Sequence, residues 1–274
     1  MKKLLLALCI LVFCSCGKQS SNSTLADDSG KVKFEWDFSK QRTFVYSFSQ
    51  TTNGESKLDK DYPAEKADMT VNGYLNIKVK AHNLADLSFT DVKMSTVLFD
   101  TQGSPTDTVT NEMPITAVQD MRPDGSFRDT NSDLTLDILF PLPRKNIGKG
   151  ESDQIPMQMY MNAGATRLSA NGSLVLTFMG YEEVDSVKCA VFKGDIDVSQ
   201  LDVPIELKEE YHFSTEGKAT YYFDPENGYY IGADINMTSK TLINDTLEGR
   251  DSFNIYQDQS YSNTYKMRLA RIEE

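Results

Sequence analysis

Residues 211–236 read YHFSTEGKATYYFDPENGYYIGADIN, in which two alternating aromatic stretches flank the turn sequence Asp224-Pro225-Glu226-Asn227-Gly228. A period of two is typical of β-strands, and Pro, Asn and Gly in a short loop between two such stretches are typical of a hairpin. We therefore predict a β-hairpin with strands over 211–223 and 229–242. This is the strongest hairpin signal in the chain, and it indicates an all-β fold.

The same alternation extends along the chain in both directions. Stretches with a helical period and a helical length are almost absent, so helices should be few and short. Long antiparallel strands must each bury one face, which predicts either two packed sheets or one strongly curved sheet. Further strands are predicted over 34–38, 44–48, 75–81, 87–99, 115–121, 134–140, 156–161, 168–181, 184–198 and 253–272, with polar turns or loops over 51–66, 105–111 and 122–125.

The sequence Phe140-Pro141-Leu142-Pro143 interrupts this alternation, because two prolines spaced by one residue do not fit a central strand. It is the best internal boundary. It divides the chain into a first β half (31–145) and a second β half (146–274), which could also form one continuous domain. The halves resemble each other around Asn72-Gly73 and Asn171-Gly172. An offset of about one hundred residues suggests an ancestral duplication, with chance similarity between alternating strands as the alternative.

The composition is that of a folded, acidic protein. The hydrophobic fraction is 39%, and the formal net charge is −12. An acidic surface repels polyanions, which argues against a nucleic-acid partner. Cys189 lies in the alternating stretch Val187–Val191, with no histidine predicted beside it, so a buried and inert thiol is expected.

The first residues have the features of an export signal. Met1-Lys2-Lys3 is cationic, and Leu4–Phe13 is an apolar run too short to span a bilayer. The next residues, Phe13-Cys14-Ser15-Cys16, resemble the lipobox of bacterial lipoproteins, in which a small residue precedes the cysteine that takes the lipid. Residues 1–15 are therefore predicted to be a signal peptide, and residues 16–30, rich in Ser, Asn and Gly, a flexible tether.

With this lipobox and an all-β remainder, the chain resembles the uncharacterised envelope lipoproteins of Bacteroidetes-type bacteria. The resemblance implies that Cys16 carries a lipid such as palmitate. It also implies an anchor in the outer membrane, on the periplasmic or the cell-surface face, but no particular activity. Such bacteria attach O-linked sugars at Asp-Ser/Thr-aliphatic sites of exported proteins. Thr108 and Thr246 match that pattern and are predicted to lie in loops.

Few residues are suited to catalysis or metal binding. His82 is predicted in a turn and His212 on the polar face of a strand, with no zinc or Ser-His motif around either. Asp129–Asp133 has alternating oxygen donors but lacks the glycine and glutamate of a calcium loop, so a solvated turn is preferred. We therefore expect no catalytic residue, cofactor or metal. A hydrolase using carboxylates such as Asp224 and Glu226 is the weakest alternative.

Methionine and aromatic residues gather in Met157–Met161 and around Tyr222, Tyr229 and Tyr230. A packed core is the preferred interpretation, and an apolar groove is the alternative. The first hypothesis for the function is a lipid-anchored binding or scaffolding component that contacts other envelope proteins. The alternative is a periplasmic carrier of a lipid or another small apolar ligand, which requires an apolar cavity.

Overall fold

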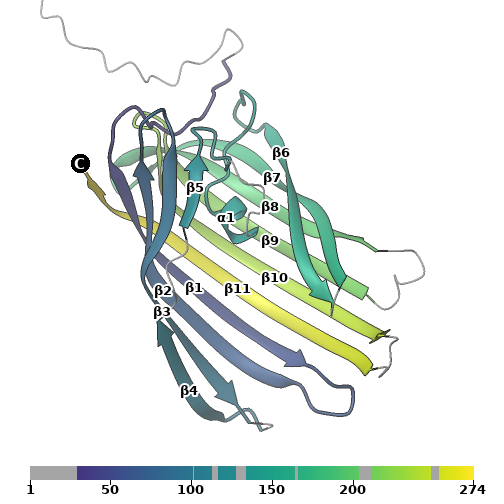
Figure 1. The fold of residues 1–274 in the computed structure, drawn as a ribbon. Coiled ribbons are helices and arrows are strands. Elements are labelled where there is room, and N and C mark those ends of the chain that lie inside the picture. Colours follow the sequence, from purple (N-terminus) through teal and green to yellow (C-terminus); the bar gives the residue numbers. More distant parts are fainter. Residues whose placement is uncertain are drawn as a thin grey trace, which may run out of the picture.

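The fold is one large curved sheet that remains open along one side. The computed structural model describes residues 30–100, 102–112, 117–127, 134–163, 166–203, 211–247 and 253–274. Eleven strands pair in the order β4-β3-β2-β1-β11-β10-β9-β8-β7-β6, with β5 beside β3 (Figure 1). Over the described ranges, no pairing joins β6 to β4 or β5, so the sheet does not close into a barrel.

The all-β prediction is confirmed, and the strands are long and antiparallel. One short helix, α1 (Leu134–Leu139), separates two groups of strands. The first group is β1 (Thr43–Lys57), β2 (Glu65–Val79), β3 (Ala85–Phe99), β4 (Pro105–Glu112) and β5 (Ala117–Met121). The second group is β6 (Ser152–Ala163), β7 (Thr166–Val184), β8 (Val187–Asp202), β9 (Tyr211–Asp224), β10 (Tyr229–Leu247) and β11 (Phe253–Glu273).

The hairpin predicted from residues 211–236 is formed by β9 and β10. The Gly228 N–H donates to the Asp224 carbonyl oxygen at 2.9 Å, and Gly228 has a φ of 69°. Only glycine adopts this left-handed conformation without strain, which explains its place in the turn. The turn predicted at Arg122–Gly125 is also present, closed by the Gly125 N–H and the Arg122 carbonyl oxygen at 2.9 Å.

The two predicted halves share this single sheet. Each half is largely an antiparallel meander, and the first and last strands of the sequence, β1 and β11, join the two meanders by pairing with each other. Asn72-Gly73 and Asn171-Gly172 both lie at register shifts, in β2 and in β7. A Cβ atom at Gly73 or Gly172 would come within 3.0 Å of the neighbouring strand. The duplication itself stays a prediction.

Residues 31–38 do not form the predicted strand, although their alternation is real. They run as an extended segment inside the curve of the sheet, with Val32, Phe34, Trp36 and Phe38 all buried. Backbone bonds hold the segment to other loops rather than to a strand ladder. The Trp36 N–H donates to the carbonyl oxygen of Pro123 at 2.8 Å, and Val32 forms an isolated bridge with Ile147.

The strand predicted over 134–140 is wrong, because α1 occupies most of this range. Ile138 and Leu139 are adjacent, yet both are fully buried. A strand would have turned one of them outward, whereas a helical turn enclosed by a curved sheet can bury both. We call residues 31–38 and 134–149 the plug, since together they fill one end of the concave face (Figure 1).

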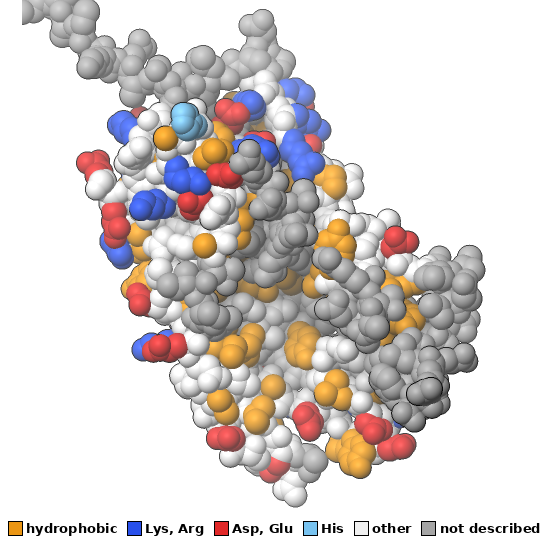
Figure 2. Space-filling view, viewed as in Figure 1, with side chains coloured by type: hydrophobic (Ala, Val, Ile, Leu, Met, Phe, Trp, Pro, Cys, Tyr) orange, Lys and Arg blue, Asp and Glu red, His pale blue; other side chains and the backbone are white. Residues whose placement is uncertain are grey.

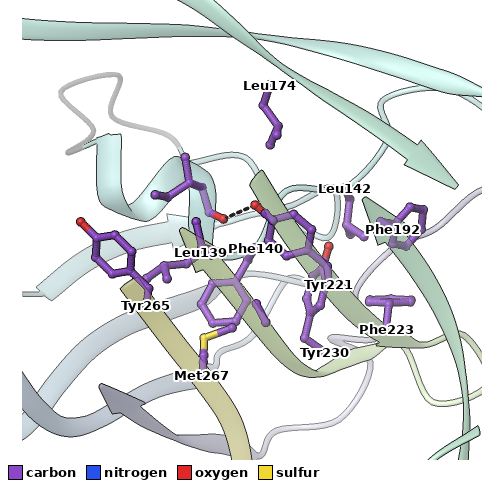
Figure 3. Close-up of a cluster of buried hydrophobic side chains, with 14 of the residues drawn as sticks. Leu139, Phe140, Leu142, Leu174, Phe192, Tyr221, Phe223, Tyr230, Tyr265 and Met267 are labelled. Atoms are coloured by element: carbon purple, nitrogen blue, oxygen red, sulfur yellow. Dashed lines mark hydrogen bonds between the residues drawn. The ribbon is translucent and has the colours of Figure 1, made fainter. Parts of the chain in front are cut away.

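Buried tyrosines of the sheet fasten the plug. The Tyr221 hydroxyl donates to the Ile138 carbonyl oxygen at 2.7 Å, and the Tyr230 hydroxyl donates to the Pro141 carbonyl oxygen. Burial raises the pKa of both phenols, so each remains an uncharged donor at ordinary pH. Figure 3 shows Leu139, Phe140 and Leu142 lying against these tyrosines. Pro141 and Pro143 therefore lie in the segment that crosses the core between α1 and β6. This segment carries the chain from the first half to the second, and no strand runs through it.

The loop predicted over 105–111 is also wrong, and the polar turn predicted over 51–66 is confirmed only for residues 58–64. β1 continues to Lys57, β2 begins at Glu65, and β4 occupies Pro105–Glu112. These extensions pair in regular register, but β4 is exposed throughout and the ends of β1 and β2 are only half-buried or exposed. Because no packed core covers these strand ends, their sequence lacks the apolar alternation that reveals a strand.

Candidate functional site: the uncovered end of the concave face

The plug covers only one end of the concave face. Along β1, the inward residue Phe48 is 5% exposed, and the next inward residue, Gln50, is half-buried. Along β11, Met267 and Tyr265 are buried, whereas Asn263 is half-buried. The covered part of the sheet therefore thins out over two residue pairs, because Gln50 lies opposite the buried Tyr265 and Asn263 lies opposite Thr52, which is 8% exposed. Beyond it, Figure 2 shows the face hollowed, with hydrophobic side chains around the depression.

We call this uncovered end the hollow. It has a floor, formed by the central strands β1, β10 and β11, and two walls, formed by the strands that curve forward on either side. The strand register places these inward residues opposite one another on the floor: Gln50, Thr52, Gly54, Ser56, Ser239, Thr241, Gln257, Gln259, Tyr261 and Asn263. Two further inward residues of β10, Met237 and Ile243, are apolar and buried. From Gln50 to Ser56, a strand rise of about 3.3 Å per residue gives the floor a length of about 20 Å.

Methionines form much of both walls. Met69 on β2 and Met94 on β3 lie on one side, and Met157 and Met159 on β6 lie on the other. Met157 is buried, and the other three are half-buried and pack against the core cluster. Methionine is unbranched and polarisable, so it adapts to apolar ligands of variable shape. The two walls therefore present soft apolar surface on either side of the floor.

The floor is polar but uncharged. The Thr52 hydroxyl donates to Asn263 Oδ1 at 2.7 Å, and Gln50 Nε2 donates to the Thr52 hydroxyl at 3.2 Å. Farther out, Gln259 Nε2 donates to the Ser56 hydroxyl at 3.0 Å. These amide and hydroxyl groups form a ladder of neutral donors and acceptors across the strands.

Most charged side chains of the floor and wall strands lie on the opposite, convex face. The register places two acidic residues of the wall strands on the concave side, Glu65 opposite Ser56 and Asp107 opposite Leu98. Lys66 and Asp68 alternate with the inward residues Ala67 and Met69. On the same convex side, Arg268 pairs with Asp234 at 2.6 Å. Among the described inward positions 50–56 of β1, 237–243 of β10 and 257–263 of β11, none carries a charge.

Tyr261 brings an aromatic ring into the floor. A Cβ atom at Gly54 would lie 2.2 Å from Cδ1 of Tyr261, so the ring rests directly on the backbone of β1. Glycine is required at position 54 for this close approach. The ring adds an apolar surface between the amide groups at the uncovered end of the floor.

A second recess, of about 570 Å³, lies between the plug and the edge strand β6. Its lining includes Lys33, Glu35, Asp124 and Arg144, together with Phe140 and Leu142 of the plug. Charged side chains thus surround this recess, in contrast to the hollow. The mixed lining is less suited to an apolar ligand than the methionine walls are.

The three tyrosines predicted to line a groove do not share one surface. Tyr230 is fully buried in the core beside the plug, whereas Tyr222 and Tyr229 are half-buried. Tyr222 follows Tyr221, which points into the core, so Tyr222 faces the convex side. The core interpretation therefore holds for Tyr230. By contrast, Met157 and Met159 of the predicted methionine-rich stretch do line the hollow.

The isolated reactive residues occupy structural positions. Cys189 is fully buried, and burial, with smaller contributions from Asp224 and Asp185, raises the pKa of its thiol to about 11. The predicted buried, inert thiol is confirmed, because so little thiolate forms at neutral pH. His82 lies in the β2–β3 turn and His212 is exposed on β9, as expected.

The predicted carboxylate pair also has a structural explanation. The carboxylate of Asp224 is buried and accepts hydrogen bonds from the N–H groups of Glu226 and Asn227 and from Asn227 Nδ2. These bonds cap the hairpin turn. Glu226 is exposed in the same turn. In the described part of the chain, no three His, Cys, Asp or Glu side chains gather where they could hold a metal ion.

Several predictions concern other positions. Thr108 is exposed on β4 and Thr246 lies within β10, so the expectation that both lie in loops is wrong, while their glycosylation stays a prediction. Cys16 and the possible calcium loop at 129–133 lie outside the described residues. No described helix is long and apolar enough to cross a bilayer.

Comparison with known proteins gives no family. No protein-family model and no curated protein matches the chain. One structure, described as "Lipid-protein interactions in lipovitellin", is 11% identical with a TM-score of 0.45, covering 86% of this chain and 26% of the lipovitellin chain. A DUF1329 family protein from Desulfovibrio piger is 9% identical with a TM-score of 0.16, covering 85% and 88% of the two chains. The chain thus spans about a quarter of the lipovitellin chain. Both likenesses are too distant to bear on function.

Proposed function

We propose that this protein binds an apolar ligand in the hollow, and that a hydrocarbon chain is the part of the ligand held between the methionine walls. The observation that carries the proposal is the half-exposed state of Met69, Met94 and Met159 beside a floor without charge. Partly exposed apolar side chains that gather on one face usually mark a binding site. The plug supports the proposal, because it rigidifies one end of the sheet and leaves the other end free to receive a ligand.

The energetic gain from such binding would be substantial. Each methylene group transferred from water to an apolar site contributes about 0.8 kcal/mol. A floor about 20 Å long can accommodate a long extended chain. The loss of translational and rotational freedom on association opposes this gain, so a long chain should bind stably whereas a short one should not.

The proposal predicts that the purified protein carries a bound lipid. Native mass spectrometry of the mature chain, purified without detergent, should show a mass above that of the polypeptide. Mild collisional activation should then release the extra mass as an organic molecule with a hydrocarbon chain. Preparations that contain only the bare polypeptide, and that take up no long-chain lipid when it is supplied, would contradict the proposal.

We also propose that the protein is a lipoprotein of the cell envelope, anchored to the outer membrane through Cys16. The lipobox-like Phe13-Cys14-Ser15-Cys16 and the polar stretch after it support the proposal. Cells grown with labelled palmitate should incorporate label into the wild-type protein and into the Cys14→Ala variant, but not into Cys16→Ala. Label that persists in Cys16→Ala would show that the assignment is wrong.

A further inference from the structure

We propose that the ligand of the hollow is an uncharged lipid bearing ester, amide or hydroxyl groups, such as an acylglycerol, rather than a fatty acid or a lipid amine. This inference rests on the proposed function and specifies its ligand class. It is carried by the chemistry of the floor: neutral hydrogen-bonding groups run along the centre of the hollow, with apolar walls on both sides. A ligand that matches this arrangement has neutral polar groups along one side and hydrocarbon on the other.

The absence of charge on the floor argues against a charged ligand. An ion removed from water without a partner loses solvation free energy on the order of the whole gain from burying a short chain. In the described floor positions, a bound carboxylate would find no Lys or Arg, and a bound ammonium would find no Asp or Glu. On the neighbouring strand β2, the one inward carboxylate is that of Glu65, opposite Ser56 at the last pair of the β1–β2 ladder. Lys66 and Lys266 belong to the same strands, but they project from the convex face.

The floor also argues against a ligand that is purely hydrocarbon. Gln50, Thr241 and Asn263 are half-buried, so water can still reach them in the free protein. A hydrocarbon laid over these groups would remove that water and return no hydrogen bond, which lowers the affinity for each group left unsatisfied. An ester carbonyl can accept from an amide N–H, and a hydroxyl can both accept and donate, so a neutral polar lipid avoids that cost.

A set of probes with the same oleyl chain tests this inference. Monoolein, oleate, oleylamine and octadecene differ in their polar groups and share the length of hydrocarbon. Their affinities can be measured by displacement of a fluorescent monoacylglycerol from the mature protein, at pH 8 so that oleate is ionised. We expect monoolein to bind at least about tenfold more tightly than each of the other three.

The outcomes separate this inference from the proposed function. If none of the probes binds, the proposed function fails. If oleate or oleylamine binds as tightly as monoolein, the hollow tolerates charge and the inference is overturned. If octadecene matches monoolein, the floor contributes nothing and the inference is overturned as well, although apolar binding remains.

A charge placed on the floor provides a matched test. Thr241→Lys should shift the preference from monoolein toward oleate by about tenfold, because the new ammonium supplies the missing counter-charge. Thr238→Lys places the same charge on the exposed convex side of the same strand and should leave the preference unchanged. Circular dichroism identifies a misfolded variant, and Gln257→Lys, nearer the end of β11, then replaces Thr241→Lys. An equal shift in the inward and outward variants would overturn the inference.

Discussion

Replacing Phe140 with alanine should lower the free energy of unfolding by about 3–5 kcal/mol, which is the usual cost of deleting a buried aromatic side chain. Phe140 is 2% exposed and joins the plug to the sheet. Its ring centroid lies 5.5 Å from that of Trp36, 5.4 Å from that of Tyr46 and 5.8 Å from that of Tyr230. The substitution leaves a cavity among rings that have little freedom to close it.

Urea denaturation followed by fluorescence measures this effect. Trp36 is the single tryptophan of the chain, and it lies within the plug beside Phe140, so its emission reports on the contact being tested. Phe99→Ala is the control, because Phe99 is only half-buried at the end of β3. The control should cost at most about 1 kcal/mol. Equal losses of unfolding free energy in the two variants would contradict the claim that Phe140 and its contacts in the plug stabilise the fold more than a half-buried residue does.

The sequence predicts the sheet where the sheet has a packed core. Strands β7 to β10 follow from alternation, because one face of each is buried over much of its length and the other meets water. Strands β6 and β11 are also predicted, although among their described residues only Met157 of β6 and Tyr265 and Met267 of β11 are buried. Phe34, Trp36 and Phe38 alternate for the same reason without forming a strand. Alternation therefore predicts which side chains are buried. It does not predict whether the backbone pairs with a neighbouring strand, which depends on the tertiary structure.

The helix α1 could not be predicted from its sequence. Leu134, Leu136 and Ile138 alternate as they would in a strand, and a helix of this length carries too few residues to show its own period. Its helical form depends on enclosure within the sheet, which buries Ile138 and Leu139 together. Long-range packing of this kind leaves no local signal.

The hollow was only partly predictable. The stretch Met157–Met161 was identified as a candidate apolar surface, but Met69 and Met94 lie in other strands and meet it only through the curvature of the sheet. The β1 part of the floor falls in the polar turn predicted over 51–66, since Thr52 and Ser56 show no apolar alternation, whereas its β10 and β11 parts lie in predicted strands. A weaker signal is present in the same residues: the two charged residues of β1, Glu55 and Lys57, both occupy outward positions beside the neutral inward residues Gly54 and Ser56.

Placing a negative charge on each methionine wall should remove the ligand. Met69→Glu and Met159→Glu each put a carboxylate beside the proposed hydrocarbon chain, where neither Lys nor Arg lies among the described floor positions. The double variant should contain at least about tenfold less bound ligand than the wild type. A bound hydrocarbon chain would keep water away from carboxylates that have no counter-charge on the floor. Both positions are half-exposed in the free protein, so a glutamate at either should cost little stability.

The most direct measurement is the ligand content of two double variants, by native mass spectrometry of proteins purified side by side. Met69→Glu/Met159→Glu charges the concave face, and Thr70→Glu/Gln158→Glu charges the convex face at the adjacent residues of the same strands. The predicted result is a nearly empty protein from the first variant and a wild-type ligand content from the second. Retention of ligand by the first variant, or equal loss from both, would contradict binding in the hollow.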